Sequence, residues 1–108
     1  MTTRKPRKSS DTDEKFLERL IGGPLTLGGA LSALRESEEE SLAVFSERLS
    51  ISRTHLSDIE HGRRSVSPER ASRFAKALRQ NEAQFVRLAL QDQIRSAGLR
   101  LRVDVHAA

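Results

Sequence analysis

The sequence of 108 residues contains no cysteine, tryptophan or tyrosine, and only four phenylalanines. Without cysteine there is no disulfide framework, no thiolate metal site and no cysteine nucleophile. The few aromatic rings argue against stacking platforms for single-stranded nucleic acid. Six glycines and three prolines are too few for a turn-rich β-sandwich. No apolar run approaches the roughly 18 residues of a membrane span. These absences favour a small, mostly helical domain, which we expect to be cytoplasmic.

The formal net charge of +4 is unevenly distributed along the chain. Residues 1–10 carry +4, residues 11–40 carry −5, residues 41–80 carry +4 and residues 81–108 carry +1. Acidic residues rather than an apolar stretch follow the basic N-terminus, which argues against a secretory signal. The basic middle of the chain is therefore where we expect an anionic partner such as nucleic acid to bind.

Composition and periodicity divide the chain into four segments. Residues 1–12 hold one apolar residue and are predicted to form a disordered basic arm, which either adds salt-dependent DNA affinity or only improves solubility. Residues 13–23 predict an accessory N-terminal helix with its apolar residues on one face. Residues 24–80 predict a compact helical domain, and residues 81–108 predict a C-terminal helix and strand.

The expected helices begin at residues that are favourable helix caps. Their ranges and caps are 27–36 after Thr26, 42–49 after Ser41, 53–61 after Ser52, a helix opened by Ser67 and Pro68, and a last helix to about residue 97 after Asn81. Gly62 and Gly98 stand where a left-handed residue ends a helix.

Residues 99–105 alternate apolar and polar side chains, which is the pattern of a strand with one buried face. A lone strand leaves its backbone groups unpaired, so we expect it to pair with the same strand of a second subunit or with another protein. The alternative is a disordered tail. The last helix is also more apolar than a small core requires. The predicted dimerisation residues are Phe85, Leu88, Leu99, Leu101, Val103 and Val105.

Residues 41–64 read as two short helices joined by a tight turn, which is a helix-turn-helix unit. Ser46 supplies the small residue needed where the two helices cross. Ile51, Leu56 and Ile59 are apolar on the turn and on the inner face of the second helix. The outer face of that helix is polar throughout, as is required of a surface that reads base edges.

This stretch resembles the Xre/Cro-like helix-turn-helix domains of bacterial and phage repressors over about residues 27–79. The resemblance is carried by Ser41, Phe45, Ser46, Leu49, Ser50, Ile51, Ser52, Leu56, Ser57, Ile59, Glu60, Gly62, Arg63 and Arg64. It implies an all-α, five-helix-type domain like that of lambda repressor, here with an extra N-terminal helix and a short C-terminal β-strand for dimerisation. Three positions depart from the family pattern: Leu42 replaces a Gln that usually contacts phosphate, Ser46 replaces Ala, and Ser50 replaces the Gly of the turn.

The resemblance also implies roles for particular residues. The base-reading candidates are Arg53, Thr54, His55, Ser57 and Asp58, where Asp58 either accepts from a base or orients Arg53 or His55. The phosphate-contacting candidates are Ser41, Ser52, His61, Arg63 and Arg64. Arg35 and Glu60 are expected to form a partly buried structural ion pair at the base of the second helix.

We therefore expect a homodimeric, sequence-specific transcriptional repressor that binds double-stranded DNA as an inverted repeat, with recognition helices about 34 Å apart. The alternative is a protein-interaction module, such as an antitoxin that binds a toxin through its C-terminal region. No catalytic, metal or cofactor site is predicted. His55 and His61, six residues apart, do not share one helical face and so are not expected to bind a metal together with Glu60.

Overall fold

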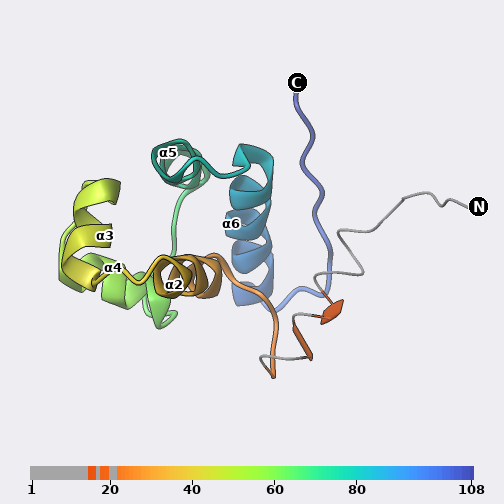
Figure 1. Ribbon diagram of the computed structural model, residues 1–108. Coiled ribbons are helices and arrows are strands. Elements are labelled where there is room, and N and C mark those ends of the chain that lie inside the picture. The colour runs from red at the N-terminus through yellow and green to blue at the C-terminus, as the bar shows by residue number, and fades with distance from the viewer. Residues whose placement is uncertain (1–14, 17, 20–21) are drawn as a thin grey trace, which may run out of the picture.

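The computed structural model describes residues 15–16, 18–19 and 22–108, which contain five complete helices and no strand (Figure 1). The helices are α2 (Leu27–Ser37), α3 (Leu42–Leu49), α4 (Arg53–Glu60), α5 (Pro68–Leu78) and α6 (Glu82–Ser96). The expectation of a helical domain is confirmed for this part of the chain, and each helix lies close to its predicted range.

Each helix begins at a polar side chain that accepts a hydrogen bond from its first turn, as the sequence predicts. Thr26 Oγ1 and the Oγ atoms of Ser41, Ser52 and Ser67 accept from backbone N–H groups three residues later, at 2.9–3.1 Å. Asn81 Oδ1 does the same at 2.8 Å. Each cap satisfies an N–H group that the helix leaves unpaired, and is worth about 1 kcal/mol. The helix starts are therefore encoded locally.

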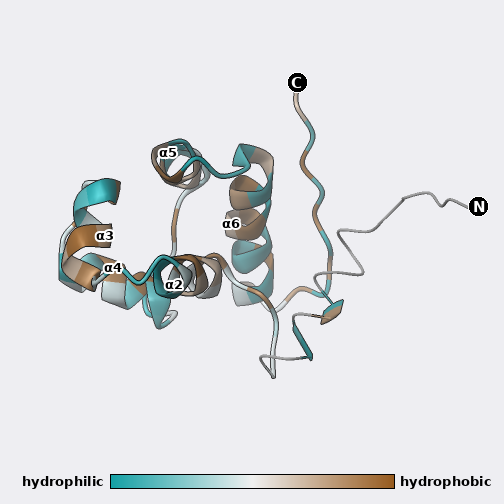
Figure 2. Cartoon of the chain, viewed as in Figure 1, coloured by the Kyte–Doolittle hydropathy of each residue, from teal (hydrophilic) through white to brown (hydrophobic). Residues whose placement is uncertain are grey.

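One hydrophobic core joins the five helices. Leu31 of α2, Phe45 of α3 and Leu56 of α4 are fully buried, and Phe74 of α5 and Leu88 of α6 meet them in the same cluster. Each such side chain stabilises the fold by about 1.5–3 kcal/mol. Figure 2 shows hydrophobic and hydrophilic stretches alternating along the helices, as expected of helices that turn one side toward a core.

The last helix, α6, packs against α5 and α2 and completes this core (Figure 1). Phe85 and Leu88 are only 6% and 1% exposed within a single chain. Their assignment to a dimer interface is therefore wrong, because both side chains are already covered by the neighbouring helices. The apolar residues of this helix pack in the core of the single chain.

Residues 99–105 do not form the predicted strand, because the described residues provide no second strand to pair with them. The chain instead turns at Gly98, which has a φ of +76°, and runs back along α6 (Figure 1). The Gln91 side chain holds it: Gln91 Nε2 donates to the Leu101 carbonyl at 2.7 Å, and the Val103 N–H donates to Gln91 Oε1 at 3.0 Å. Of the predicted interface residues in this segment, Leu99 and Leu101 are exposed and Val103 and Val105 are half-buried.

Part of the predicted accessory helix is visible before α2. Residues 15–16 and 18–19 are helical, and the Glu18 carboxylate accepts from the Leu25 N–H at 3.2 Å. The other residues of this prediction up to Ile21 lie outside the described part of the chain, as does the whole of the predicted basic arm, residues 1–12.

Candidate nucleic-acid interface

Helices α3 and α4 meet through the three-residue turn 50–52. Ser50 adopts the left-handed conformation, with φ 59° and ψ 40°. This conformation lets the Ile51 N–H donate to the Ser46 carbonyl at 3.0 Å. Ser46 is 3% exposed, and its hydroxyl donates to the Ala43 carbonyl at 3.0 Å, so a polar residue is accommodated at the buried crossing of the two helices. The turn thus sets α4 across α3.

The N-terminal ends of α3 and α4 are both exposed and both capped by serine. Ser41 Oγ accepts from the Val44 N–H and Ser52 Oγ from the His55 N–H, so each hydroxyl keeps its own proton to donate elsewhere. The helix dipoles place partial positive charge at these ends. Residues at the starts of both helices line one hollow, so two helix ends that favour an anionic oxygen lie close together.

The outer face of α4 adjoins the start of α3 across a shallow hollow in the surface. Arg53 and Thr54 are exposed, and Ser57 and Asp58 one turn later are half-buried. The hollow is lined by Ser41, Leu42, Ala43, Arg53, Thr54, Ser57, Asp58 and Arg63. Six of the ten residues predicted to contact DNA are thus brought together. Ser52, His55, His61 and Arg64 are not among its lining residues.

Leu42 lines the hollow but also packs against the protein core. It is half-buried. The position at which the family pattern has a phosphate-contacting Gln is therefore used for packing here.

Asp58 is paired with Arg63 and not with Arg53 or His55. Arg63 Nε donates to Asp58 Oδ1 at 2.9 Å, and the Arg63 N–H donates to the Asp58 carbonyl at 2.8 Å. Gly62, with φ +76°, turns the chain after α4 so that Arg63 folds back over the last turn of the helix. The expectation that Asp58 orients Arg53 or His55 is corrected accordingly: its hydrogen-bonded partner is Arg63.

His55 contacts an arginine that the sequence had not indicated. Arg70 Nη1, from the first turn of α5, lies 3.2 Å from His55 Nε2. A guanidinium only donates, so Nε2 accepts and the imidazole proton lies on Nδ1. Burial lowers the pKa of His55, and the positive charges of Arg64 and Arg70 lower it further against the opposing effect of Asp58. His55 is therefore a neutral imidazole at pH 7.

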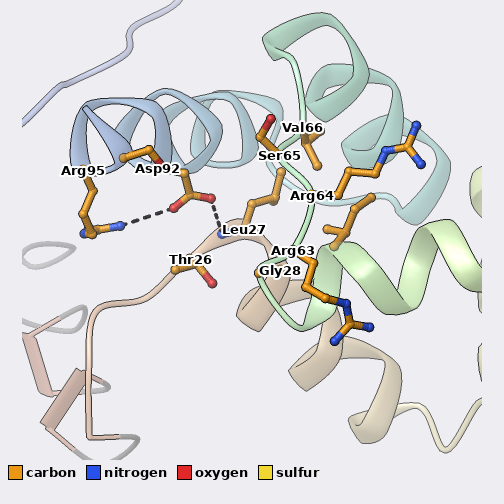
Figure 3. Close-up of a pocket in the computed structure, with 12 residues that line it drawn as sticks. Thr26, Leu27, Gly28, Arg63, Arg64, Ser65, Val66, Asp92 and Arg95 are labelled. Carbon is orange, nitrogen blue, oxygen red and sulfur yellow. Dashed lines mark hydrogen bonds and ion pairs between the residues drawn. The ribbon is translucent and has the colours of Figure 1, made fainter. Parts of the chain in front are cut away.

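The remaining basic candidates follow α4. His61 Nδ1 donates to the Ser57 carbonyl at 2.8 Å, which holds the exposed ring against the end of the helix. Arg63 and Arg64 are both exposed, and Figure 3 shows their side chains extending in different directions from the loop. The two guanidinium groups can therefore reach different anionic groups.

An ion pair between Arg35 and Glu60 holds the C-terminal end of α4 against α2. Arg35 Nε and Nη2 donate to the two Glu60 carboxylate oxygens at 2.9 and 3.0 Å, and Nη1 donates to the Glu40 carbonyl at 3.1 Å. The side chains of Arg35 and Glu60 are 17% and 4% exposed. The hydrogen bond to Glu60 is the main reason that the pKa of Arg35 is raised. The structure thus brings together the two residues that the resemblance paired.

Gly28 allows α2 to pass close to the end of α4, a constraint that the sequence did not reveal. A Cβ added at Gly28 would overlap the Ile59 carbonyl oxygen and lie 2.9 Å from its carbonyl carbon. Only glycine therefore permits this approach. No local pattern distinguishes Gly28 from its neighbour Gly29, whose added Cβ would meet only Thr26 Oγ1, at 3.2 Å.

Asp92 ties α6 to the start of α2 beside this crossing (Figure 3). Its carboxylate accepts from the Leu27 N–H at 3.1 Å and from Arg95 Nη1 at 3.3 Å, and it lines a pocket together with Gly28 and Arg64. Burial raises the pKa of Asp92, against the opposing effects of the Leu27 N–H and of Arg95. The pairing spans 65 residues of sequence and had no local signal.

Within residues 15–16, 18–19 and 22–108, no three acidic, histidine or cysteine side chains gather as they would around a metal ion. In the same part of the chain, no helix has the length and apolar character that a membrane crossing needs.

Comparison with known proteins gives the class. Residues 26–88 match the model of a helix-turn-helix domain family, more than half of the chain. The chain therefore belongs to the helix-turn-helix domain family, and the match is consistent with the Xre/Cro-like resemblance. Searches of curated proteins and of solved structures found no match. Membership of this family supports a DNA-binding regulator.

Proposed function

We propose that this protein is a sequence-specific transcriptional regulator that binds double-stranded DNA with α4 in the major groove. We further propose that it acts as a homodimeric repressor of its own or a neighbouring gene, at an inverted repeat. The observation that carries the proposal is the gathering of Ser41, Arg53, Thr54 and Arg63 around one exposed hollow at the positive ends of two capped helices. Helix-turn-helix domains dock with this end of the second helix toward base edges.

Arg53 and Thr54 are the primary base-reading residues in this proposal. Both are exposed in the first turn of α4, which enters deepest into the groove. The Arg53 guanidinium matches the O6 and N7 acceptors of guanine, and Thr54 offers a hydroxyl and a methyl group. His55 presents an Nδ1–H donor, and Ser57 presents a hydroxyl one turn further along.

Contacts to the DNA backbone set the register of the domain. The Ser41 and Ser52 hydroxyls donate to phosphate oxygens at the two helix ends, and His61, Arg63 and Arg64 approach the backbone after α4. The role of Asp58 is to position Arg63, since its carboxylate already accepts from that side chain at 2.9 Å. The Asp58 carboxylate also repels any phosphate that comes close to it when the domain is shifted along the DNA backbone.

Three matched arginine-to-alanine variants test the assignment on a DNA site selected from a random pool. Arg53→Ala should lose about 1–3 kcal/mol of discrimination at one base pair. Arg63→Ala should instead weaken binding to every DNA sequence and lower the slope of log affinity against log salt concentration by about 1. Arg79→Ala removes the same charge from an exposed position outside the hollow and should change neither quantity by much. Equal losses in all three variants would show that only net charge matters and would reject the proposed interface.

A homodimer reads half-sites separated by a whole number of DNA turns, about 34 Å or a multiple of it. If the protein is a homodimer in solution, light scattering at micromolar concentration should give the mass of two chains. A second candidate function, a module that binds a partner protein such as a toxin, is favoured by the exposed Leu99 and Leu101. A random pool that yields no enriched sequence, together with a monomeric mass, would support that second function instead.

A further inference from the structure

Arg70 belongs to α5, outside the helix-turn-helix unit, yet its side chain reaches the first turn of α4. Arg70 Nη1 lies 3.2 Å from His55 Nε2, although the two residues are 15 positions apart in the sequence. Both residues are half-buried, and the backbone of Arg70 is held at the start of α5, where its N–H donates to Ser67 Oγ at 3.1 Å. The core residue Phe74, one turn further along, is 3% exposed and anchors this helix. Arg70 therefore approaches His55 from a fixed position.

The contact determines which ring nitrogen of His55 carries the proton. His55 is neutral at pH 7, so its ring has one N–H donor and one acceptor. A guanidinium has no acceptor, so a hydrogen bond between the two side chains needs a bare Nε2 and leaves the proton on Nδ1. Among the residues that the structure describes, none accepts a hydrogen bond from Nδ1. The Nδ1–H group is thus the polar group of His55 that remains for a ligand.

We propose that Arg70 is a positioning residue, which holds His55 as an Nδ1–H donor and so determines which bases α4 accepts at the position that His55 faces. This inference rests on the proposed function and names one element of its sequence preference. An Nδ1–H group can donate to N7 or O6 of guanine, to N7 of adenine or to O4 of thymine. Cytosine offers only its N4 amino donor at this edge of the groove, so it would set donor against donor. The preferred DNA site should therefore exclude cytosine at the position that His55 contacts.

The opposite tautomer of His55 would read the reverse pattern. With the proton on Nε2, Nδ1 becomes an acceptor and can receive the amino group of cytosine or adenine. If Arg70 served only as a positive charge beside the DNA backbone, its removal would weaken every sequence alike and leave the tautomer of His55 unchanged. The tautomer and the base preference together therefore distinguish the two roles of Arg70.

The first arm of the test measures the tautomer in the full chain without DNA. Nuclear magnetic resonance of protein with isotope-labelled histidine nitrogens reports which ring nitrogen carries the proton, at a pH of about 8 where the imidazoles are neutral. The chain has three histidines, and His55→Ala identifies the signals of His55 by their loss. The wild-type chain should show a protonated Nδ1 and a bare Nε2. A proton on Nε2 in the wild-type chain would overturn the inference without any variant of Arg70.

The matched variants are Arg70→Met and Arg73→Met. Arg70→Met keeps the apolar stem of the side chain and removes the guanidinium, so the proton of His55 should move to Nε2 in a large part of the molecules. Arg73→Met removes the same charge from an exposed side chain of the same helix and should leave the tautomer unchanged. Arg70→Lys keeps a charged donor and should retain more of the Nδ1–H form than Arg70→Met does. Circular dichroism checks that each variant is folded.

The second arm uses the DNA site selected by the wild-type chain, with each base replaced in turn. At the position where His55→Ala removes the preference, the wild-type chain should bind the cytosine variant about tenfold or more weakly than the preferred base. Arg70→Met should reduce this difference to about threefold or less, whereas Arg73→Met should leave it as it is. In the double variant His55→Ala/Arg70→Met the loss of Arg70 should have no further effect on this preference, because Arg70 acts through His55.

The outcomes separate this inference from the proposed function. A His55 tautomer that does not respond to Arg70→Met, or an unchanged discrimination against cytosine in that variant, overturns the inference while the proposed function stands. A random DNA pool that enriches no sequence rejects the proposed function. In that case an Nδ1–H form that is lost in Arg70→Met still supports Arg70 as the residue that positions His55.

Discussion

Removal of Glu60 should destabilise the domain far more than removal of any exposed acidic partner. Glu60→Ala leaves Arg35 charged and 83% covered, without the two hydrogen bonds of 2.9 and 3.0 Å that now compensate it. Breaking a buried pair from one side costs about 3–5 kcal/mol, and the residual exposure of Arg35 together with its bond to the Glu40 carbonyl reduces this to about 2–4 kcal/mol. For a domain of this size the melting temperature should fall by about 8–30 °C.

The matched control is Glu38→Ala, which also removes a carboxylate from an arginine. Glu38 is 34% exposed, and its partner Arg48 keeps its contact with Glu40 at 2.8 Å, so the loss should stay below about 1 kcal/mol. The assay is urea or thermal unfolding followed by circular dichroism at fixed protein concentration, since the chain has no tryptophan or tyrosine fluorescence.

A third variant separates burial from attraction. Replacing both partners, as Arg35→Met/Glu60→Met, removes the unpaired charge as well as the pair and should be much less destabilised than Glu60→Ala. Equal small losses for Glu60→Ala and Glu38→Ala would show that the Arg35–Glu60 pair behaves as a solvated surface pair and not as a buried one.

Three further predictions follow from the backbone and from His55. Gly28→Ala should cost several kcal/mol or prevent folding, because its Cβ overlaps the Ile59 carbonyl, while Gly29→Ala in the same helix should be nearly neutral; equal melting temperatures would contradict the close crossing. Ser50→Gly should stabilise the chain by about 0.5–1 kcal/mol by relieving its left-handed conformation, and Ser50→Ala should bring no such gain; a loss in both would place the strain elsewhere. Because folding lowers the pKa of His55 below 6.5, the unfolded chain takes up that proton first as the pH falls, so stability should decline below about pH 6.5. His55→Gln should flatten this part of the profile, and an unchanged slope would show that His55 titrates alike in both states.

Local features of the fold could be predicted from the sequence because they depend on neighbouring residues. Thr26, Ser41, Ser52, Ser67 and Asn81 each cap the helix that they were expected to cap, since a cap bonds within three residues of itself. The end of a helix is encoded in the same local way by a glycine with positive φ. The order and extent of the helices follow from these signals together with apolar periodicity.

Contacts between distant residues were not accessible in the same way. The special position of Gly28 depends on the Ile59 carbonyl near the end of α4, 31 residues later, and the role of Asp92 depends on the first N–H of α2. Neither residue differs in local pattern from its neighbours. The pairing of Asp58 with Arg63, five residues away, was missed for a different reason: a helical pattern does not show where a side chain beyond the turn at Gly62 will point.

The C-terminal segment shows why alternation alone does not make a strand. Residues 99–105 have the period of a strand, but a strand also needs a second strand to pair with, and the described residues supply none. The Gln91 side chain bonds the backbone of Leu101 and Val103 instead. Phe85 and Leu88 were misassigned because periodicity identifies an apolar face and not what covers it. The composition of a helix is therefore a weaker guide to its partner than its place in the fold.

The measurement that most directly tests the central claim is selection of fragments bound by the purified full chain from a random pool of double-stranded DNA. If α4 reads DNA sequence, one short sequence, arranged as an inverted repeat, should be enriched, and Arg53→Ala should lose the preference at one position. A pool that stays random after several rounds, at salt concentrations low enough to retain nonspecific binding, would contradict the claim that α4 reads DNA sequence.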